Sequence, residues 1–303
     1  MALTAEISAI TQDLFLPKLV DNIFNSNTLF QRFKKKGLRL LDGGTKIVQP
    51  LAYAVTTAVG WYSGADALST TNNDQFTSAE FDWRQAYANI TISRLDELKN
   101  SGKSAIVNYV KSKVQMAEKT LANSMGTALF GSGGSDDIDG LGIALAATGT
   151  YGGIAKATYS WWQGNVDSTT TILTIAALQG GFGDVTIDND KPTVAVTTQD
   201  LFDAYYGLLQ PQQRFTDSET AKGGFTNLMF NGIPIVVDSH QASGDLMLLN
   251  ENYLELAVHK DENFRFEPFI KPTNQNVSTA KIYWAGNLVC SNPRMQKYFS
   301  ALT

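Results

Sequence analysis

The chain has 303 residues and a mass of 33.0 kDa, and 43% of its residues are hydrophobic, so it has enough apolar material for a core and is not a disordered protein. This length allows one large domain or two modest ones. Charged residues make up only 17%, against about 25% in an average soluble protein. This composition fits a surface covered by other subunits as well as it fits a mildly polar monomer. The net charge of −5 argues against a dedicated nucleic-acid-binding protein, which would carry a basic face.

Signals for disulfides, secretion and membrane insertion are missing. Cys290 is the only cysteine, so no intrachain disulfide can form, and a reducing compartment fits this. The first fifteen residues, MALTAEISAITQDLF, lack the basic and apolar regions of a secretory signal peptide. No stretch approaches 18 apolar residues, so we expect no membrane span and no membrane partner.

Residues that could carry catalysis or bind metals are scarce. His240 and His259 are the only histidines, and their spacing from Cys290 does not suit a zinc site. The glycine-rich residues 130–135 match neither a nucleophile elbow nor a phosphate-binding loop. Residues 135–140 resemble the start of a calcium loop but lack two of the required carboxylates. We therefore predict no catalytic residue, no metal site and no cofactor, and hence a protein that is not an enzyme.

The N-terminal region combines an arm with a basic cluster. Residues 4–25 have helical spacing with a break at Pro17, which predicts an arm of short helices rather than a domain. The basic cluster consists of Arg32, Lys34, Lys35, Lys36 and Arg39. These cations either contact packaged nucleic acid or an acidic neighbour, or they form the last turn of a helix that Gly37 caps. The pattern favours the second alternative.

Two β-rich segments, 45–58 and 79–93, flank a polar stretch that is too long for a tight turn. The simplest arrangement is a long antiparallel hairpin with an extended tip, which has little core of its own. Several aromatic residues would then be partly exposed on a monomer: Trp61, Tyr62, Phe76, Phe81 and Trp83. Either the hairpin projects over a neighbouring subunit, where these residues make intersubunit contacts, or it folds back on its own core.

Residues 101–130 have the clearest helical pattern. Small and apolar residues recur there at spacings of three and four: Val107, Val110, Val114, Ala117, Leu121, Ser124 and Ala128. Thirty residues form a helix about 45 Å long, whereas helices in compact domains average about 11–12 residues. We therefore predict a strut that crosses a flat or elongated molecule and ends at Gly131.

The remainder of the chain alternates between strands and helices. In residues 151–164 glycines and aromatics interleave, so Trp161 and Trp162 are expected to be buried or interfacial, with ligand stacking as the alternative. The pattern predicts a helix or buried strand at 171–179 and a loop at 180–184. Further elements are expected as follows: a strand at 192–198, a helix at 199–209 capped by Thr198, two strands in 226–238 joined at Asn231-Gly232, and strands at 246–258, 264–270 and 278–290. This is an α+β chain with two intertwined subdomains and no clean linker.

In this order of elements the chain resembles the major capsid proteins of tailed bacteriophages, which have the Hong Kong 97-like fold. The resemblance is carried by PLAYA and WYSGADAL in the hairpin, RLDELKNSG before the long helix, and then YGGIAKATYSWWQG, FNGIPIVVDSH and LLNENYLEL. No single motif is decisive, because capsid proteins have no catalytic residues to mark them. The order of these segments across residues 4–300 carries the resemblance.

The resemblance implies a specific division of this α+β chain into parts of the Hong Kong 97-like fold. These parts are an N-terminal arm at 1–42, an extended loop formed by the β-hairpin at 43–93, a peripheral domain with the spine helix at 94–134, an axial domain at 135–250, peripheral-domain strands at 251–279, and a return to the axial domain at 280–303. The hairpin would reach across a neighbour, and the basic cluster would lie on the inner face.

The resemblance also implies a function. Copies of the chain would form hexamers and pentamers that close into an icosahedral shell, and packaged double-stranded DNA would be contacted only non-specifically. Further implied partners are a scaffolding protein, a portal protein and a decoration protein. The protein would be located in the virion capsid after assembly in the host cytoplasm.

Two departures from the family bear on assembly. Some members cross-link subunits through a lysine in the extended loop, but residues 47–98 contain no lysine, so we expect no such isopeptide bond. Some members carry a long N-terminal scaffolding segment, whereas the arm here begins almost at Met1, so we expect a separate scaffolding protein.

Two other functions remain open. An encapsulin-type bacterial nanocompartment shell protein has the same fold, and sequence patterns do not distinguish it from a phage capsid protein. A carbohydrate-binding or adhesin module is the weaker alternative, suggested by Trp161, Trp162 and the polar loops.

Overall fold

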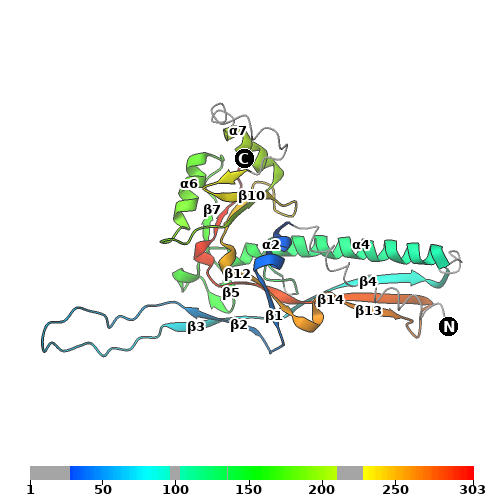
Figure 1. Cartoon of the computed structure of the whole chain (residues 1–303), viewed down its shortest axis with the longest axis horizontal. Coiled ribbons are helices and arrows are strands. Elements are labelled where there is room, and N and C mark those ends of the chain that lie inside the picture. Colours follow the sequence, from blue (N-terminus) through cyan, green and yellow to red (C-terminus); the bar gives the residue numbers. More distant parts are fainter. Residues whose placement is uncertain (1–27, 96–102, 135, 210–227) are drawn as a thin grey trace.

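The computed structural model describes residues 28–95, 103–134, 136–209 and 228–303. The predicted short helices at 4–25 lie outside these residues. The described chain mixes helices and strands, as the sequence predicts, and it has three projecting parts (Figure 1). A two-stranded arm extends to one side, a long helix and its sheet extend to the other, and a second sheet with its helices rises above their junction.

The first sheet has five strands and supports the long helix. It is built from β1 (Leu38–Leu41), β12 (Leu254–His259), β14 (Val277–Cys290), β13 (Arg265–Ile270) and β4 (Arg84–Ser93). The central strand is β14, whose residues 277–286 pair with β4 while residues 286–290 pair with β12. Its burial is nearly continuous in the C-terminal half, as expected for a strand covered on both faces.

The long helix α4 (Lys103–Phe130) confirms the predicted strut. Its 28 residues correspond to about 42 Å. The buried stripe is Val110, Val114, Ala117, Leu121, Met125 and Leu129. Ser124, which the sequence placed on this stripe, is exposed, and Met125 takes its place.

The second sheet has six strands in the order β7 (Asn165–Asp167), β15 (Lys297–Phe299), β11 (Leu246–Leu249), β8 (Val194–Thr197), β10 (Ile233–Val237) and β9 (Met229–Phe230). The parallel strands β8 and β10 are connected through helix α7 (Gln199–Leu209), as in a β-α-β unit. Helix α6 (Ile175–Asp184) and α7 contribute to the core that covers this sheet.

The chain crosses between the two sheets more than once. Residues 250–253, which include the 3-10 turn η4 (Glu251–Tyr253), lead from β11 to β12, and residues 291–296 lead from β14 to β15. Neither sheet is therefore formed by one continuous segment of the chain. Strand pairing places the last change of sheet at 291–296 rather than at residue 280, because β14 remains in the five-stranded sheet up to Cys290.

Several local predictions need correction. The predicted loop at 180–184 is the second half of α6, because Phe182 is buried and Gly181 packs so closely on Phe299 that an added Cβ would lie 2.3 Å from its ring. The Thr198 hydroxyl has no hydrogen-bond partner and does not cap α7. The predicted Asn231-Gly232 turn is confirmed, and both residues have positive φ angles of 47° and 80°.

The remaining short elements are α5 (Leu141–Ala144), β5 (Thr150–Tyr151), β6 (Ile154–Ala155) and the 3-10 turns η1 (Ser160–Trp162), η5 (Lys260–Glu262) and η6 (Pro293–Met295). A helix α2 (Thr28–Lys36) precedes β1. In the part of the chain that the structure describes, no helix is both long and apolar enough to cross a membrane.

Candidate assembly interface

The arm is a hairpin whose base is fixed in the core. Strands β2 (Ile47–Ala52) and β3 (Phe76–Phe81) pair in antiparallel register, with Ile47 opposite Phe81. Side chains on one face of this pair are buried: Ile47, Leu51, Ala79 and Phe81. The prediction of a hairpin is therefore confirmed, but its return strand is shorter than expected. Residues 84–93 leave the arm and form β4 against β14.

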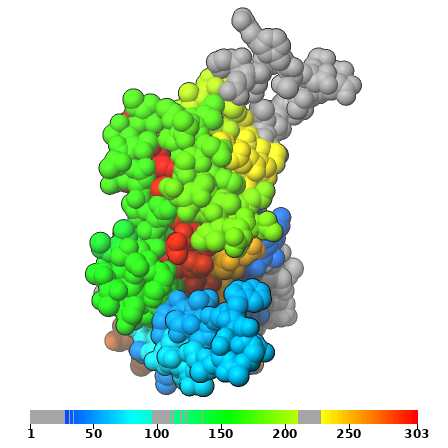
Figure 2. All heavy atoms as spheres, turned by 90° about the vertical axis from the view of Figure 1, so that its left-hand side faces the viewer, coloured from blue at the N-terminus to red at the C-terminus, as the bar shows by residue number. Residues whose placement is uncertain are grey.

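Beyond this base, residues 53–75 extend away from the rest of the molecule (Figure 1). Few hydrogen bonds join the two sides: the Tyr53 N–H donates to the Gln75 carbonyl over 3.0 Å, and the Asn73 amide donates to the Val55 carbonyl over 3.0 Å. The large apolar side chains of the arm are exposed: Val55, Val59, Trp61, Tyr62, Leu68 and Phe76. These exposed apolar side chains make the arm a candidate interaction surface. Figure 2 looks along the arm, whose tip faces the viewer uncovered.

The predicted contact residues divide between the arm and its base. Trp61, Tyr62 and Phe76 are exposed as expected, and Trp61 is fully so. Phe81 was predicted to be partly exposed, and this is wrong: it is 1% exposed and packs edge-on against Tyr151 at 5.0 Å between ring centroids. Trp83 is half-buried, and its indole N–H donates to the Gly44 carbonyl over 2.8 Å.

Three exposed residues of the arm were missed by the sequence analysis: Val55, Val59 and Leu68. They are single apolar residues in a polar stretch, so no periodicity identified them. The expected length of the hairpin tip could have indicated their exposure, because a two-stranded arm has no interior in which such side chains could be buried.

The arm has a distinct charge. Between residues 47 and 83 there is no lysine or arginine, and the charged residues are Asp66, Asp74, Glu80 and Asp82. In contrast, α4 contains four lysines and one glutamate. The arm is therefore an apolar, acidic projection, and the long helix is the complementary basic element of the same chain.

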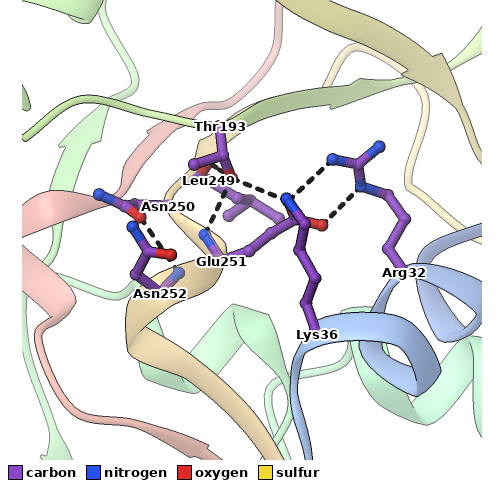
Figure 3. Close-up of polar contacts among 7 residues, drawn as sticks. All are labelled: Arg32, Lys36, Thr193, Leu249, Asn250, Glu251 and Asn252. Atoms are coloured by element: carbon purple, nitrogen blue, oxygen red, sulfur yellow. Dashed lines mark hydrogen bonds and ion pairs between the residues drawn. The ribbon is translucent and has the colours of Figure 1, made fainter.

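Three members of the basic cluster form ion pairs within the chain. Arg32 binds Glu251 through two hydrogen bonds of 2.5 and 2.8 Å, and the Lys36 ammonium lies 3.7 Å from the same carboxylate (Figure 3). The Thr193 hydroxyl also donates to Glu251 over 2.9 Å. Burial raises the pKa of Glu251, but hydrogen bonds and charge from Arg32, with smaller contributions from Thr193 and Lys36, hold it below its usual value.

The other members of the cluster lie apart. Arg39 donates to the Gln49 side chain over 2.9 Å and lies 3.5 Å from Glu255, whereas Lys35 is exposed. The Lys34 side chain lies outside the described residues. Helix α2 ends at Gly37, whose N–H donates to the Phe33 carbonyl over 2.8 Å. This geometry supports the alternative in which the cations belong to a helix end and to ion pairs within the chain.

Cys290 and Trp162 are buried, and Trp161 is half-buried. Cys290 is fully buried, and burial raises the pKa of its thiol to about 12. Trp162 is buried and donates to the Tyr151 carbonyl over 2.9 Å, so it cannot stack on a ligand. Trp161 is half-buried and stacks on Tyr53. Within the described ranges, no group of three or more histidine, cysteine, aspartate or glutamate residues could hold a metal ion.

Comparison with known proteins identifies the fold. No protein-family model matches the chain, and no curated protein matches its sequence. Among solved structures, the capsid asymmetric unit of cyanophage A-1(L) has a TM-score of 0.65 at 17% identity and covers 90% of this chain and 93% of its own. The capsid of a native GTA particle has a TM-score of 0.64 at 13% identity, covering 89% and 90%.

A third similar structure is the virus-like particle from Pyrococcus furiosus, with a TM-score of 0.54 at 10% identity, covering 95% of this chain and all of that one. Identities this low establish the fold and no more. The likeness extends over almost the whole chain rather than over one domain. The protein thus has the fold of phage capsid proteins.

Proposed function

We propose that this chain is the major capsid protein of a tailed double-stranded DNA bacteriophage. Copies assemble as hexamers and pentamers into an icosahedral shell that encloses the genome, after synthesis in the host cytoplasm. The observation that carries the proposal is the exposed apolar arm on a chain whose whole length has a capsid fold. A monomer gains nothing from this surface, whereas an assembly buries it.

The parts of the Hong Kong 97-like fold are assigned as follows. The arm is the extended loop, and α4 with the five-stranded sheet forms the peripheral domain. The six-stranded sheet with α6 and α7 forms the axial domain, near the centre of each capsomer. Strand pairing supports this assignment, because it separates the two sheets. One face of the six-stranded sheet packs with α6 and α7, and its other face joins the hydrophobic core of the five-stranded sheet.

The arm lies across a neighbouring copy in this proposal. Each large apolar side chain that becomes fully buried contributes about 1.5–3 kcal/mol, and six such side chains are exposed on the arm. The lysine-rich α4 of the neighbour offers the charge that the acidic arm lacks. Because residues 47–98 contain no lysine, these contacts are noncovalent.

The remaining partners follow from the same function. A scaffolding protein directs assembly, a portal protein occupies one vertex, and a decoration protein reinforces the shell where the arm contacts do not suffice. Packaged DNA is contacted only non-specifically. The net charge of −5 supports this, because an acidic subunit does not retain DNA while it is being packaged.

The experiment is assembly of the purified chain, alone and with its scaffolding protein, followed by light scattering and electron microscopy. The Trp61→Ala/Tyr62→Ala variant should form fewer or weaker shells while keeping the thermal unfolding temperature of the subunit, because both side chains are exposed. A chain that stays a 33 kDa monomer under all conditions would contradict the proposal. Equal losses of subunit stability and assembly would instead assign these residues to a core.

An encapsulin-type nanocompartment shell is the second candidate function. It is favoured by the likeness to the virus-like particle from Pyrococcus furiosus, which this chain matches over its full length. The contents of native particles distinguish the two functions: genome-length DNA supports the phage capsid, and a cargo enzyme supports the nanocompartment.

A carbohydrate-binding module is a weaker candidate, since Trp162 is buried. It predicts a small oligomer that binds glycans.

A further inference from the structure

A groove lies where the arm joins the body of the molecule. It has a volume of about 670 Å³ and is lined by the base of the arm on one side and by residues 152–161 on the other. The two sides are joined by a hydrogen bond of 2.9 Å from the Glu80 N–H to the Gly152 carbonyl. Gly152 has a φ angle of +56°, and an added Cβ would lie 2.8 Å from Ala79, so this close approach requires glycine.

The walls of the groove are aromatic. Tyr53 stacks on Trp161 with 5.4 Å between ring centroids, and Tyr159 lies 5.8 Å from the same indole. Phe76 also lines the groove and is 75% exposed. These side chains present ring surfaces to solvent, and such surfaces attract cations through the ring quadrupole.

The lining is also acidic. Asp74, Glu80 and Asp82 contribute carboxylates, and Lys46 is the single cation among the lining residues. Lys46 pairs with Glu80 at 3.0 Å, and the hydrogen bond and charge of Glu80 raise the pKa of Lys46. Within the described ranges, no ion pair neutralises Asp74 or Asp82. The charge of Asp82 also raises the pKa of Lys46, so one cation faces three carboxylates. The groove thus combines ring faces with a net negative charge.

We propose that this groove binds a lysine side chain from a second copy of the chain. The inference rests on the proposed shell function and adds a second contact to that of the arm tip. A lysine suits both features of the site, because its ammonium pairs with carboxylates and attracts ring faces. The arm of a neighbouring copy is not a suitable occupant of the groove, since residues 53–75 carry two acidic residues and no basic one.

The chain itself supplies suitable cations. Four lysines are exposed and have no carboxylate partner in the part of the chain that is described: Lys35, Lys119, Lys191 and Lys271. A lysine that is solvated on one copy can enter the groove of the next without breaking an existing ion pair. Identical subunits in a ring present every copy's groove to the next copy's surface, so one such contact repeats around the capsomer.

The test is zero-length cross-linking of isotopically mixed assemblies. Subunits made with ¹⁴N and with ¹⁵N are mixed and assembled, and a carbodiimide then condenses adjoining carboxylate and ammonium groups into amides with loss of water. Mass spectrometry should find a peptide containing Asp74 or Asp82 joined to a lysine peptide of the other isotope. The Asp74→Asn/Asp82→Asn variant should lose this product, and its shells should dissociate at a lower urea concentration.

A matched control removes one exposed carboxylate outside the groove, through Asp136→Asn, and should leave both the cross-link and the dissociation midpoint unchanged. Normal shells in which Asp74 and Asp82 form cross-links only within one copy, or none at all, would overturn this inference while leaving the proposed function intact. A chain that never assembles would overturn both.

Discussion

At the scale of single residues, Glu251 connects parts of the chain that are distant in sequence. It lies in η4, where the chain crosses from the six-stranded to the five-stranded sheet. Its carboxylate binds Arg32 from α2 and Thr193 from the start of β8, and only 3% of its side chain is exposed. Removing one partner of a buried ion pair leaves an uncompensated charge and costs about 3–5 kcal/mol.

We therefore expect Glu251→Gln to lower the free energy of unfolding by about 3 kcal/mol at pH 7. The pKa of Glu251 is lower in the folded chain than in the unfolded one, so its contribution is present above the unfolded value and is lost as pH falls below about 4.5. Urea unfolding at several pH values measures this. The difference between variant and wild type should shrink in acid; a constant difference would mean that the carboxylate charge is irrelevant.

At the scale of elements, strand β3 has a buried inner end and an exposed outer end. Phe81 at its inner end is 1% exposed, whereas Phe76 at its outer end is 75% exposed. Phe81→Ala should lower the free energy of unfolding by about 3–5 kcal/mol because it opens a cavity. Phe76→Ala makes the same chemical change on the same strand and should shift it by less than about 0.5 kcal/mol.

Chemical denaturation of both variants checks this prediction. Phe76→Ala should still impair assembly, because its ring lines the groove at the base of the arm. Comparable destabilisation by the two substitutions would show that the arm folds against the body of the molecule in solution.

Local patterns predicted the elements well, and nonlocal contacts account for what they missed. The apolar spacing in α4 and the Asn231-Gly232 turn are properties of neighbouring residues, so the sequence identified both. Residues 79–93 resemble one continuous strand, but β4 pairs with β14 about 190 residues later, which divides the strand. The direction of Phe81 depends on its register with Ile47, which sequence periodicity in so short a strand does not specify.

The candidate site was predicted only in outline, because local patterns identify elements but not the contacts between distant parts of the chain. The sequence predicted a long hairpin with aromatic residues near its tip and left open whether it projects or folds back, and the exposure of Trp61 and Tyr62 agrees with a projecting hairpin. It grouped Arg32 with the neighbouring lysines as one basic surface, whereas Arg32 binds Glu251, which is 219 residues away. The groove was not predicted, because its two walls come from the arm and from residues 152–161.

At the scale of the whole molecule, the outer part of the arm makes few contacts with the body. Residues 54–74 make hydrogen bonds mostly with one another, and their large apolar side chains are exposed: Val55, Val59, Trp61, Tyr62 and Leu68. We therefore expect that a folded subunit does not depend on this segment, whereas the proposed shell does. Replacing residues 54–74 by Asn-Gly closes β2 and β3 with a two-residue turn of the type that hairpins favour.

The shortened chain should unfold within about 0.5 kcal/mol of wild type and should fail to form shells with its scaffolding protein. Thermal unfolding and electron microscopy provide the two measurements. A second variant with 54–74 replaced by a Gly/Ser segment of equal length separates the role of the apolar side chains from that of the loop length. Shells formed by either variant as readily as by wild type would show that the arm is dispensable, because assembly would then draw its stabilisation from the sheets and α4 alone.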